Sequence, residues 1–260
     1  MTIENFRQSV RSGAVLLGTF IKTASHQIPE IIGRAGFDFA IIDAEHAPFS
    51  ATSLDQMALA SRATDFPSLV RVAECAAPPI GQALDIGLAG VLIPHVKDAN
   101  TANAALAAAK YSHGQRGFSP STRAANYGKI DPLAYRRAAD KQSSVWCQIE
   151  DEEALSQLDA ITAIEEIDCL FLGRADLAQS LNVDSQNDPK VIEAIAATAQ
   201  AGRRAGRTVG IYIGDMVEVP KFLELGITVF VCGSDQSLLR AQGARLRSDM
   251  TNILSARPNQ

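Results

Sequence analysis

The chain has 260 residues, of which 47% are hydrophobic, so it is long and apolar enough for one large α/β domain or two small ones. Its formal net charge is −5 and it has no block of like charges, which argues against a nucleic-acid-binding surface. Four cysteines without a CxxC spacing, no charged-then-apolar leader and no apolar run near the ~18 residues of a membrane span predict a reduced, cytoplasmic protein without a membrane segment.

After a short helix predicted over residues 2–12, apolar runs alternate with helical patterns along the chain. The runs are almost continuously apolar, as in parallel strands that are buried on both faces. The predicted strands span residues 15–20, 39–48, 69–73, 90–96, 145–150, 169–173, 208–213 and 228–232. The predicted helices span residues 27–35, 53–64, 79–86, 99–110, 131–141, 154–166, 189–204, 216–225 and 236–254, with one further helical turn from Leu177.

Eight strands, each followed by a helix, predict a single (β/α)8 TIM barrel with an N-terminal helix, formed by residues 1–260 as one domain. A doubly wound open sheet is the rival fold. That fold usually carries a glycine-rich phosphate turn after its first strand, and residues 18–22 lack one. Residues 111–130 form the one long irregular segment, which is typical of a lid or a binding loop.

Polar side chains gather where several predicted strands end, which is the edge of a TIM barrel that carries reactive groups. They are Asp43, Glu45 and His46 at the end of the second strand, Arg71 in the third, Gln148 and Glu150 in the fifth, and Asp176 after the sixth. Because side chains alternate along a strand, Gln148 and Glu150 share a face. Glu150 and Asp176 come from neighbouring strands, so their charges repel unless a cation or a proton lies between them. Such a pair suits Mg²⁺ or Mn²⁺.

Each of these residues also has a structural interpretation. Asp176 could cap the helix that follows it, and Glu150 could open a solvated acidic turn. His46 could be an ordinary loop histidine, Arg71 could neutralise a structural carboxylate, and Asp85 could lie on a helix surface. The residue types therefore allow a metal site without specifying one.

Taken together, the strand ends resemble a known family, the HpcH/HpaI class II pyruvate aldolases. The similarity extends over nearly the whole chain. The matching segments are residues 36–39 (GFDF), 42–48 (IDAEHAP), 70–72 (VRV), 83–87 (ALDIG), 90–94 (GVLIP), 116–117 (RG), 148–150 (QIE) and 173–177 (GRADL). Arg174, His95 and residues 111–123 depart from the family pattern, which leaves the aldehyde half of the substrate more open than the pyruvate half.

The resemblance implies a (β/α)8 barrel, often assembled as a hexamer, that binds Mg²⁺, Mn²⁺ or Co²⁺. It implies a role for each residue of the rim. Glu150 and Asp176 would be the metal ligands; Gln148, Gly173, Ala175 and Asp176 would hold the pyruvate unit; His46 would be the general base, oriented by Asp85; Arg71 would stabilise negative charge; and Asp43 and Glu45 would support the site.

By this resemblance, the expected function is reversible cleavage of a 4-hydroxy-2-oxo acid to pyruvate and an aldehyde through a metal-stabilised enolate. The expected partners are small molecules and further copies of the chain, as a trimer or hexamer. Related barrels act on oxaloacetate or on a CoA thioester, and Arg116 and Arg123 could then bind an acidic second substrate. A Schiff-base aldolase is less favoured, because Lys22 and Lys97 follow strands and no lysine lies inside one. A barrel that binds 2-oxo acids without turnover would lack part of this catalytic set, whereas His46, Arg71, Glu150 and Asp176 are all present.

Overall fold

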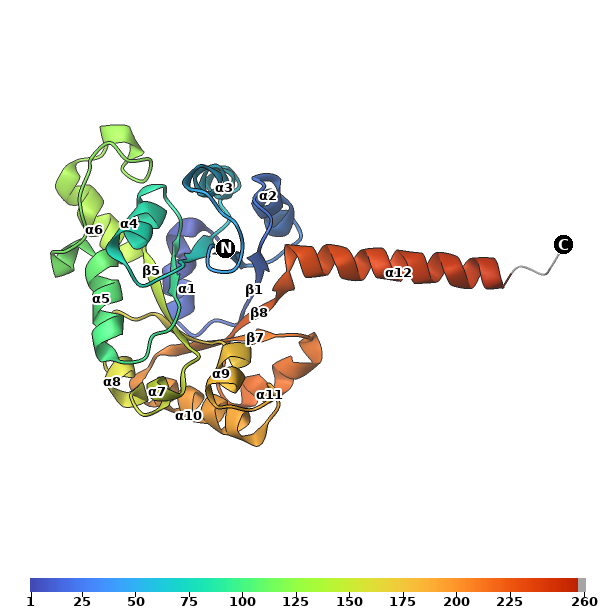
Figure 1. Ribbon diagram of the computed structural model, residues 1–260. Helices are drawn as coiled ribbons and strands as arrows, with labels where there is room; N and C mark the ends of the chain where they lie inside the picture. The colour runs from blue at the N-terminus through green and yellow to red at the C-terminus, as the bar shows by residue number, and fades with distance from the viewer. Residues whose placement is uncertain (257–260) are drawn as a thin grey trace.

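The computed structural model describes residues 1–256 and contains a closed parallel barrel in which each strand pairs with the next along the chain (Figure 1). Its strands are β1 (Leu16–Ile21), β2 (Phe39–Asp43), β3 (Ser68–Arg71), β4 (Gly90–Ile93), β5 (Ser144–Ile149), β6 (Cys169–Leu172), β7 (Thr208–Ile213) and β8 (Val229–Ser234). β8 pairs with β1 and closes the barrel. The predicted (β/α)8 fold with an N-terminal helix is confirmed.

Twelve α-helices occur within the described residues. They are α1 (Ile3–Arg11), α2 (Gln27–Arg34), α3 (Ala51–Ala63), α4 (Ala77–Asp85), α5 (Ala99–Ala109), α6 (Pro132–Gln142), α7 (Glu152–Leu155), α8 (Leu158–Thr162), α9 (Arg174–Ser180), α10 (Pro189–Ala205), α11 (Val219–Glu224) and α12 (Asp235–Ser255). Three short 3₁₀ turns, η1 (Tyr111–His113), η2 (Asn126–Gly128) and η3 (Met216–Glu218), complete the chain. No helix among these residues is long and apolar enough to cross a membrane.

Helix α1 closes the amino-terminal end of the barrel. The ring of Phe6 packs 5.6 Å from that of Phe39 and 6.0 Å from that of Trp146, measured between centroids, so the helix belongs to the apolar cluster inside the barrel. A second, larger cluster lies between the strands and the surrounding helices. The barrel interior is packed and α1 covers its amino-terminal end. A site can therefore form at the opposite rim, where the strands end.

Several predicted elements differ from the structure. The strand predicted over residues 39–48 ends at Asp43, and the helix predicted over residues 216–225 is divided into η3 and α11. The helix predicted over residues 154–166 is divided into α7 and α8. The strand predicted over residues 90–96 ends at Ile93, because Pro94 has no N–H for the sheet and His95 adopts the left-handed conformation, with φ of 52°. The chain thus turns sharply at the rim immediately after β4.

The last helix does not cover the barrel. α12 makes its main contacts with β1 and β8 and then runs straight out from the molecule (Figure 1). Several of its apolar side chains are exposed: Leu239, Leu246, Met250, Ile253 and Leu254. The barrel is therefore left without an eighth covering helix of its own.

Candidate active site

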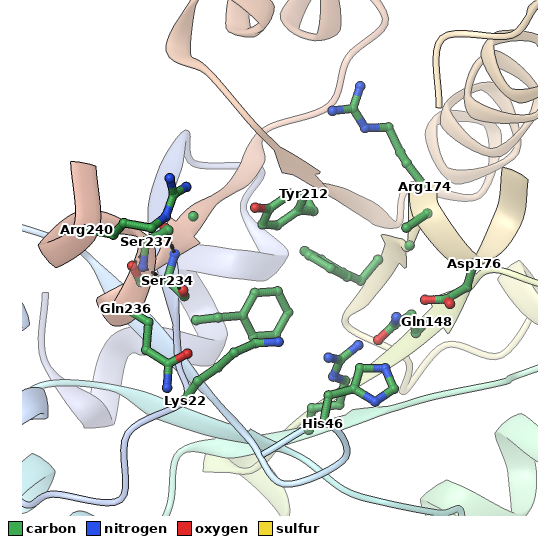
Figure 2. A pocket seen from close by; sticks show the side chains of 16 residues that line it. Lys22, His46, Gln148, Arg174, Asp176, Tyr212, Ser234, Gln236, Ser237 and Arg240 are labelled. Atoms are coloured by element: carbon green, nitrogen blue, oxygen red, sulfur yellow. Dashed lines mark hydrogen bonds between the residues drawn. The ribbon is translucent and has the colours of Figure 1, made fainter. Parts of the chain in front are cut away.

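A cavity of about 520 Å³ opens at the carboxyl-terminal ends of the strands (Figure 2). Most of the strands or the turns that follow them contribute to it, in agreement with the edge at which TIM barrels carry their sites. Its lining residues are Phe20, Lys22, His46, Arg71, Gln148, Phe171, Gly173, Arg174, Ala175, Asp176, Tyr212, Gly233, Ser234, Gln236, Ser237 and Arg240.

One end of this site holds buried amide and carboxylate groups from β5 and the turn after β6. Gln148 and Glu150 are 2% and 1% exposed, and Gln148 Nε2 donates a hydrogen bond to Glu150 Oε2. Gly173 packs directly over them, since a Cβ on this residue would lie 2.6 Å from Glu150 Oε2 and 2.8 Å from Gln148 Nε2. Glu150 is thus a buried carboxylate, and the solvated acidic turn is excluded.

Burial raises the pKa of Glu150 to about 7, and the negative charge of Asp176 adds to the rise. The main opposing contact comes from the turn after β4, where the His95 N–H donates to Glu150 Oε1 at 2.9 Å. The ring of His95 lies 3.0 Å from Asp151 Oδ2, measured from Nδ1. A buried carboxylate with so little compensating charge is an environment in which a cation would be stabilised.

Two overlapping groups of residues could hold a metal ion. Asp176 lies in the first turn of α9, lines the cavity and points toward Gln148 in Figure 2. The N-cap position of α9 is occupied by Gly173, so Asp176 is not the cap that its sequence position allowed. The ligand atoms of His95, Glu150 and Asp151 also lie within 4.8 Å of one another. Glu150 belongs to both groups.

Arg71 is held in place by carboxylates from the end of β2. Its Nε lies 3.0 Å from Asp43 Oδ1, and its two terminal nitrogens lie 2.9 Å from Asp43 Oδ2 and 3.1 Å from Glu45 Oε2. Burial pushes the pKa of Asp43 upward, but its contacts with Arg71, the His46 N–H and Lys22 together outweigh burial, and the pKa is lowered. Arg71 therefore does neutralise a buried carboxylate, and it lines the cavity as well.

His46 lines the cavity together with Arg71, and Figure 2 shows it near Gln148. Its backbone N–H donates to Asp43 Oδ1 at 3.1 Å, and its Nε2 lies 3.7 Å from Glu45 Oε2. Asp85 is elsewhere: it ends α4, and its carboxylate accepts a hydrogen bond from Arg116 at 2.8 Å. Within residues 1–256, Glu45 and not Asp85 is the carboxylate near the ring of His46.

The loop arginines considered for an acidic substrate are occupied by structural partners. Arg116 contacts Asp85, and Arg123 makes two contacts, of 2.8 and 2.7 Å, with the carboxylate of Asp55. Neither lines the cavity. Residues 111–130 pack in this way against α3 and α4. Arg174 likewise forms a paired contact with Glu218, at 2.6 and 3.0 Å, which ties α9 to η3.

Several cavity residues are not identified by the sequence pattern. Lys22 follows β1 directly, and the rule that the ends of the strands meet at the site would include it. Gln236, Ser237 and Arg240 follow β8, and the same rule points to them, but Arg240 is one of several arginines on this helix and the sequence pattern does not distinguish it from Arg245 or Arg247. Phe20 and Tyr212 belong to predicted strands, and nothing in the sequence distinguishes them from core residues.

Comparison with known proteins gives consistent results. Residues 16–241 match the family model described as HpcH/HpaI aldolase/citrate lyase. The chain is 32% identical to a pyruvate aldolase of Rhizobium etli, over 92% of this chain and 94% of that one. It is 34% identical to a 2-keto-3-deoxy-L-rhamnonate aldolase of Salmonella schwarzengrund, over 90% and 88% of the two chains. A crystal structure of an HpcH/HpaI aldolase/citrate lyase family protein from Burkholderia cenocepacia superimposes with a TM-score of 0.88 at 30% identity, over 95% of this chain and 99% of that one.

Proposed function

The chain belongs to the HpcH/HpaI aldolase/citrate lyase family and is an aldolase, a carbon–carbon lyase, and from this we propose the reaction that it catalyses. The reaction is reversible cleavage of a 4-hydroxy-2-oxo acid to pyruvate and an aldehyde, with a divalent metal ion as cofactor. One observation carries the proposal: Gln148, Asp176, Arg71 and His46 line one cavity, and the buried Glu150 accepts a hydrogen bond from Gln148.

Glu150 and Asp176 are the proposed ligands of Mg²⁺, Mn²⁺ or Co²⁺. The donor set fits, because two carboxylates are the groups that hard divalent ions prefer. Gln148 Oε1 is buried without a hydrogen-bond partner among the described residues, and Gly173 leaves the space above Glu150 free of a side chain. When bound, such an ion supplies Lewis-acid polarisation of the 2-oxo group.

The residues around the Gln148 end of the cavity bind the substrate, stabilise charge and transfer a proton. Gln148 and the backbone at Gly173 and Ala175 hold the pyruvate unit. Arg71, whose orientation is fixed by Asp43 and Glu45, stabilises the negative charge that develops on the oxygen at C2. His46 accepts the proton of the C4 hydroxyl, so that the C3–C4 bond breaks and the aldehyde leaves. Glu45 is the carboxylate near its ring; the orienting role of Asp85 stays a prediction.

The proposal extends to assembly and location. The exposed apolar face of α12 supports a homo-oligomer, a trimer or a hexamer, in which a second copy covers this face. A cytoplasmic location is proposed with it, consistent with four cysteines that are all free.

Exchange of the pyruvate methyl protons in D₂O tests this reaction, because it needs only the pyruvate half of the site. We expect exchange with Mg²⁺, Mn²⁺ or Co²⁺ added, its loss on chelation, and its loss in Glu150→Gln. Exchange that persists with chelator, together with a borohydride-trapped adduct of pyruvate, would overturn the proposal in favour of a Schiff-base lysine. Product analysis with oxaloacetate separates aldol cleavage from decarboxylation.

A further inference from the structure

The cavity extends well beyond the groups proposed to hold pyruvate. Its volume of about 520 Å³ falls in the range of sites that enclose a whole small-molecule ligand, so a three-carbon acid leaves much of it free. In Figure 2, Gln148 and Asp176 lie on one side, and the start of α12 lies on the other. Tyr212 lies between these two sides in Figure 2, and Phe20, whose ring centroid is 6.1 Å from that of Tyr212, lines the same cavity.

The far wall is cationic. It consists of Gln236, Ser237 and Arg240 from α12. Lys22 from the end of β1 also lines the cavity, but its Nζ is paired with Asp43 Oδ2 at 3.1 Å, so the positive charge of this wall comes from Arg240. The nearby carboxylate of Asp235 is engaged, because it accepts hydrogen bonds from the backbone N–H groups of Lys22, at 2.8 Å, and of Thr23, at 3.1 Å. This wall therefore presents amide and positively charged groups to the cavity.

Arg240 differs from the other two arginines of the cavity. Arg71 is paired with Asp43 and Glu45, and Arg174 with Glu218. Arg240 forms no ion pair within residues 1–256, although it lines the same cavity. An arginine that faces a ligand cavity without a carboxylate partner is a ready binding group for a carboxylate or a phosphate, which its planar guanidinium can contact through two hydrogen bonds.

We propose that Arg240, assisted by Gln236, binds an anionic group at the distal end of the aldehyde half of the substrate. The inference rests on the proposed function, because it takes the pyruvate unit to lie at Gln148 and Asp176. The substrate chain then crosses the aromatic middle of the cavity and ends at the cationic wall. Arg240 is thus a specificity-determining residue, and the substrate class is a 4-hydroxy-2-oxo acid with a terminal carboxylate or phosphate.

Two matched pairs of aldehydes test this inference in aldol addition to pyruvate. Succinic semialdehyde is compared with butanal for the carboxylate, and D-glyceraldehyde 3-phosphate with D-glyceraldehyde for the phosphate. We expect a higher kcat/KM for the charged member of one pair, which identifies the anion. Arg240→Ala should lower that preference by about 10- to 100-fold, the range for losing a hydrogen bond between charged groups, and Arg240→Lys should retain part of it.

Arg245→Ala is the matched control, because Arg245 lies on the same helix, is not among the cavity residues and is mostly exposed. It should leave the preference unchanged. An enzyme without charge preference in either pair, or an equal loss for charged and neutral aldehydes in Arg240→Ala, would overturn the inference. Where turnover is too slow, calorimetric titration of each aldehyde in the presence of pyruvate and metal gives the same comparison. Failure of the proposed function is distinct, since wild-type protein would then show no metal-dependent exchange of pyruvate protons.

Discussion

At the scale of single residues, the site depends on a glycine as much as on its charged groups. Gly173 has φ of −92°, which any residue can adopt, so its role is not conformational. The space that it leaves is what matters, because Glu150 Oε2 and Gln148 Nε2 occupy the positions next to its missing side chain. Even a methyl group would displace both polar groups.

We therefore predict that Gly173→Ala reduces metal-dependent proton exchange and aldol cleavage by about 100-fold, the cost of displacing catalytic groups by roughly 1 Å. Steady-state kinetics and metal titration of the variant measure this. Gly81→Ala is the matched control, because a Cβ at this position of α4 meets nothing within 4 Å. Similar activity in the two variants would contradict the importance assigned to the space at Gly173.

At the scale of elements, the N-terminal helix α1 forms ion pairs with one buried carboxylate of the barrel, that of Asp168. Asp168, just before β6, accepts contacts from Arg7 and Arg11 of α1, each at 2.9 Å. It also accepts hydrogen bonds from the Ser144 hydroxyl at 3.1 Å and the Val145 N–H at 3.0 Å. α1 thus closes the barrel by apolar packing and by charge.

We predict that Asp168→Ala lowers the free energy of unfolding by about 3 kcal/mol or more, the cost of removing one partner from a buried ion pair. Asp168→Asn should fall between this variant and the wild type, since it keeps part of the hydrogen bonding. Urea denaturation measures both. Asp159→Ala removes an exposed ion pair with Arg204 and should change stability by about 0.5 kcal/mol or less. An equally small effect at Asp168 would show that apolar packing alone holds α1.

At the scale of the whole molecule, α12 is the part that a single chain leaves incomplete. The helix has 21 residues and is about 31 Å long at 1.5 Å per residue. Leu239, Leu246, Met250 and Ile253 are 77%, 60%, 51% and 58% exposed and repeat at helical spacing, so they form one apolar stripe. A stripe of this kind is stabilised when another molecule covers it.

We predict that the wild-type protein is oligomeric, and that Leu239→Ser, Leu246→Ser and Ile253→Ser combined shift it to monomers, because they remove the apolar stripe. Light scattering after size-exclusion chromatography measures the mass. Ala241→Ser with Ala244→Ser, away from the stripe on the same helix, should leave the mass unchanged. A monomeric wild type, or a triple variant with unaltered mass, would contradict the proposed assembly.

The sequence by itself determined the barrel and most of its rim. Continuous apolar strands alternating with helices require a buried parallel sheet, and the side chains at strand ends must then meet at one edge. This reasoning predicts that Arg71, Gln148 and Asp176 share a rim, and all three line the cavity. These inferences succeed because they depend on local pattern and on a general rule of topology. The separate family resemblance named their roles.

Only the tertiary structure decided what depends on contacts between distant segments. It separated Asp85 from His46 within one chain, gave Arg116 and Arg123 their structural partners, and directed α12 away from the barrel. It also brought Arg240 to the wall opposite Gln148. No local pattern encodes these outcomes, because the partner of a charged side chain is set by which groups lie within a few ångströms of it in the folded chain, irrespective of their separation in sequence.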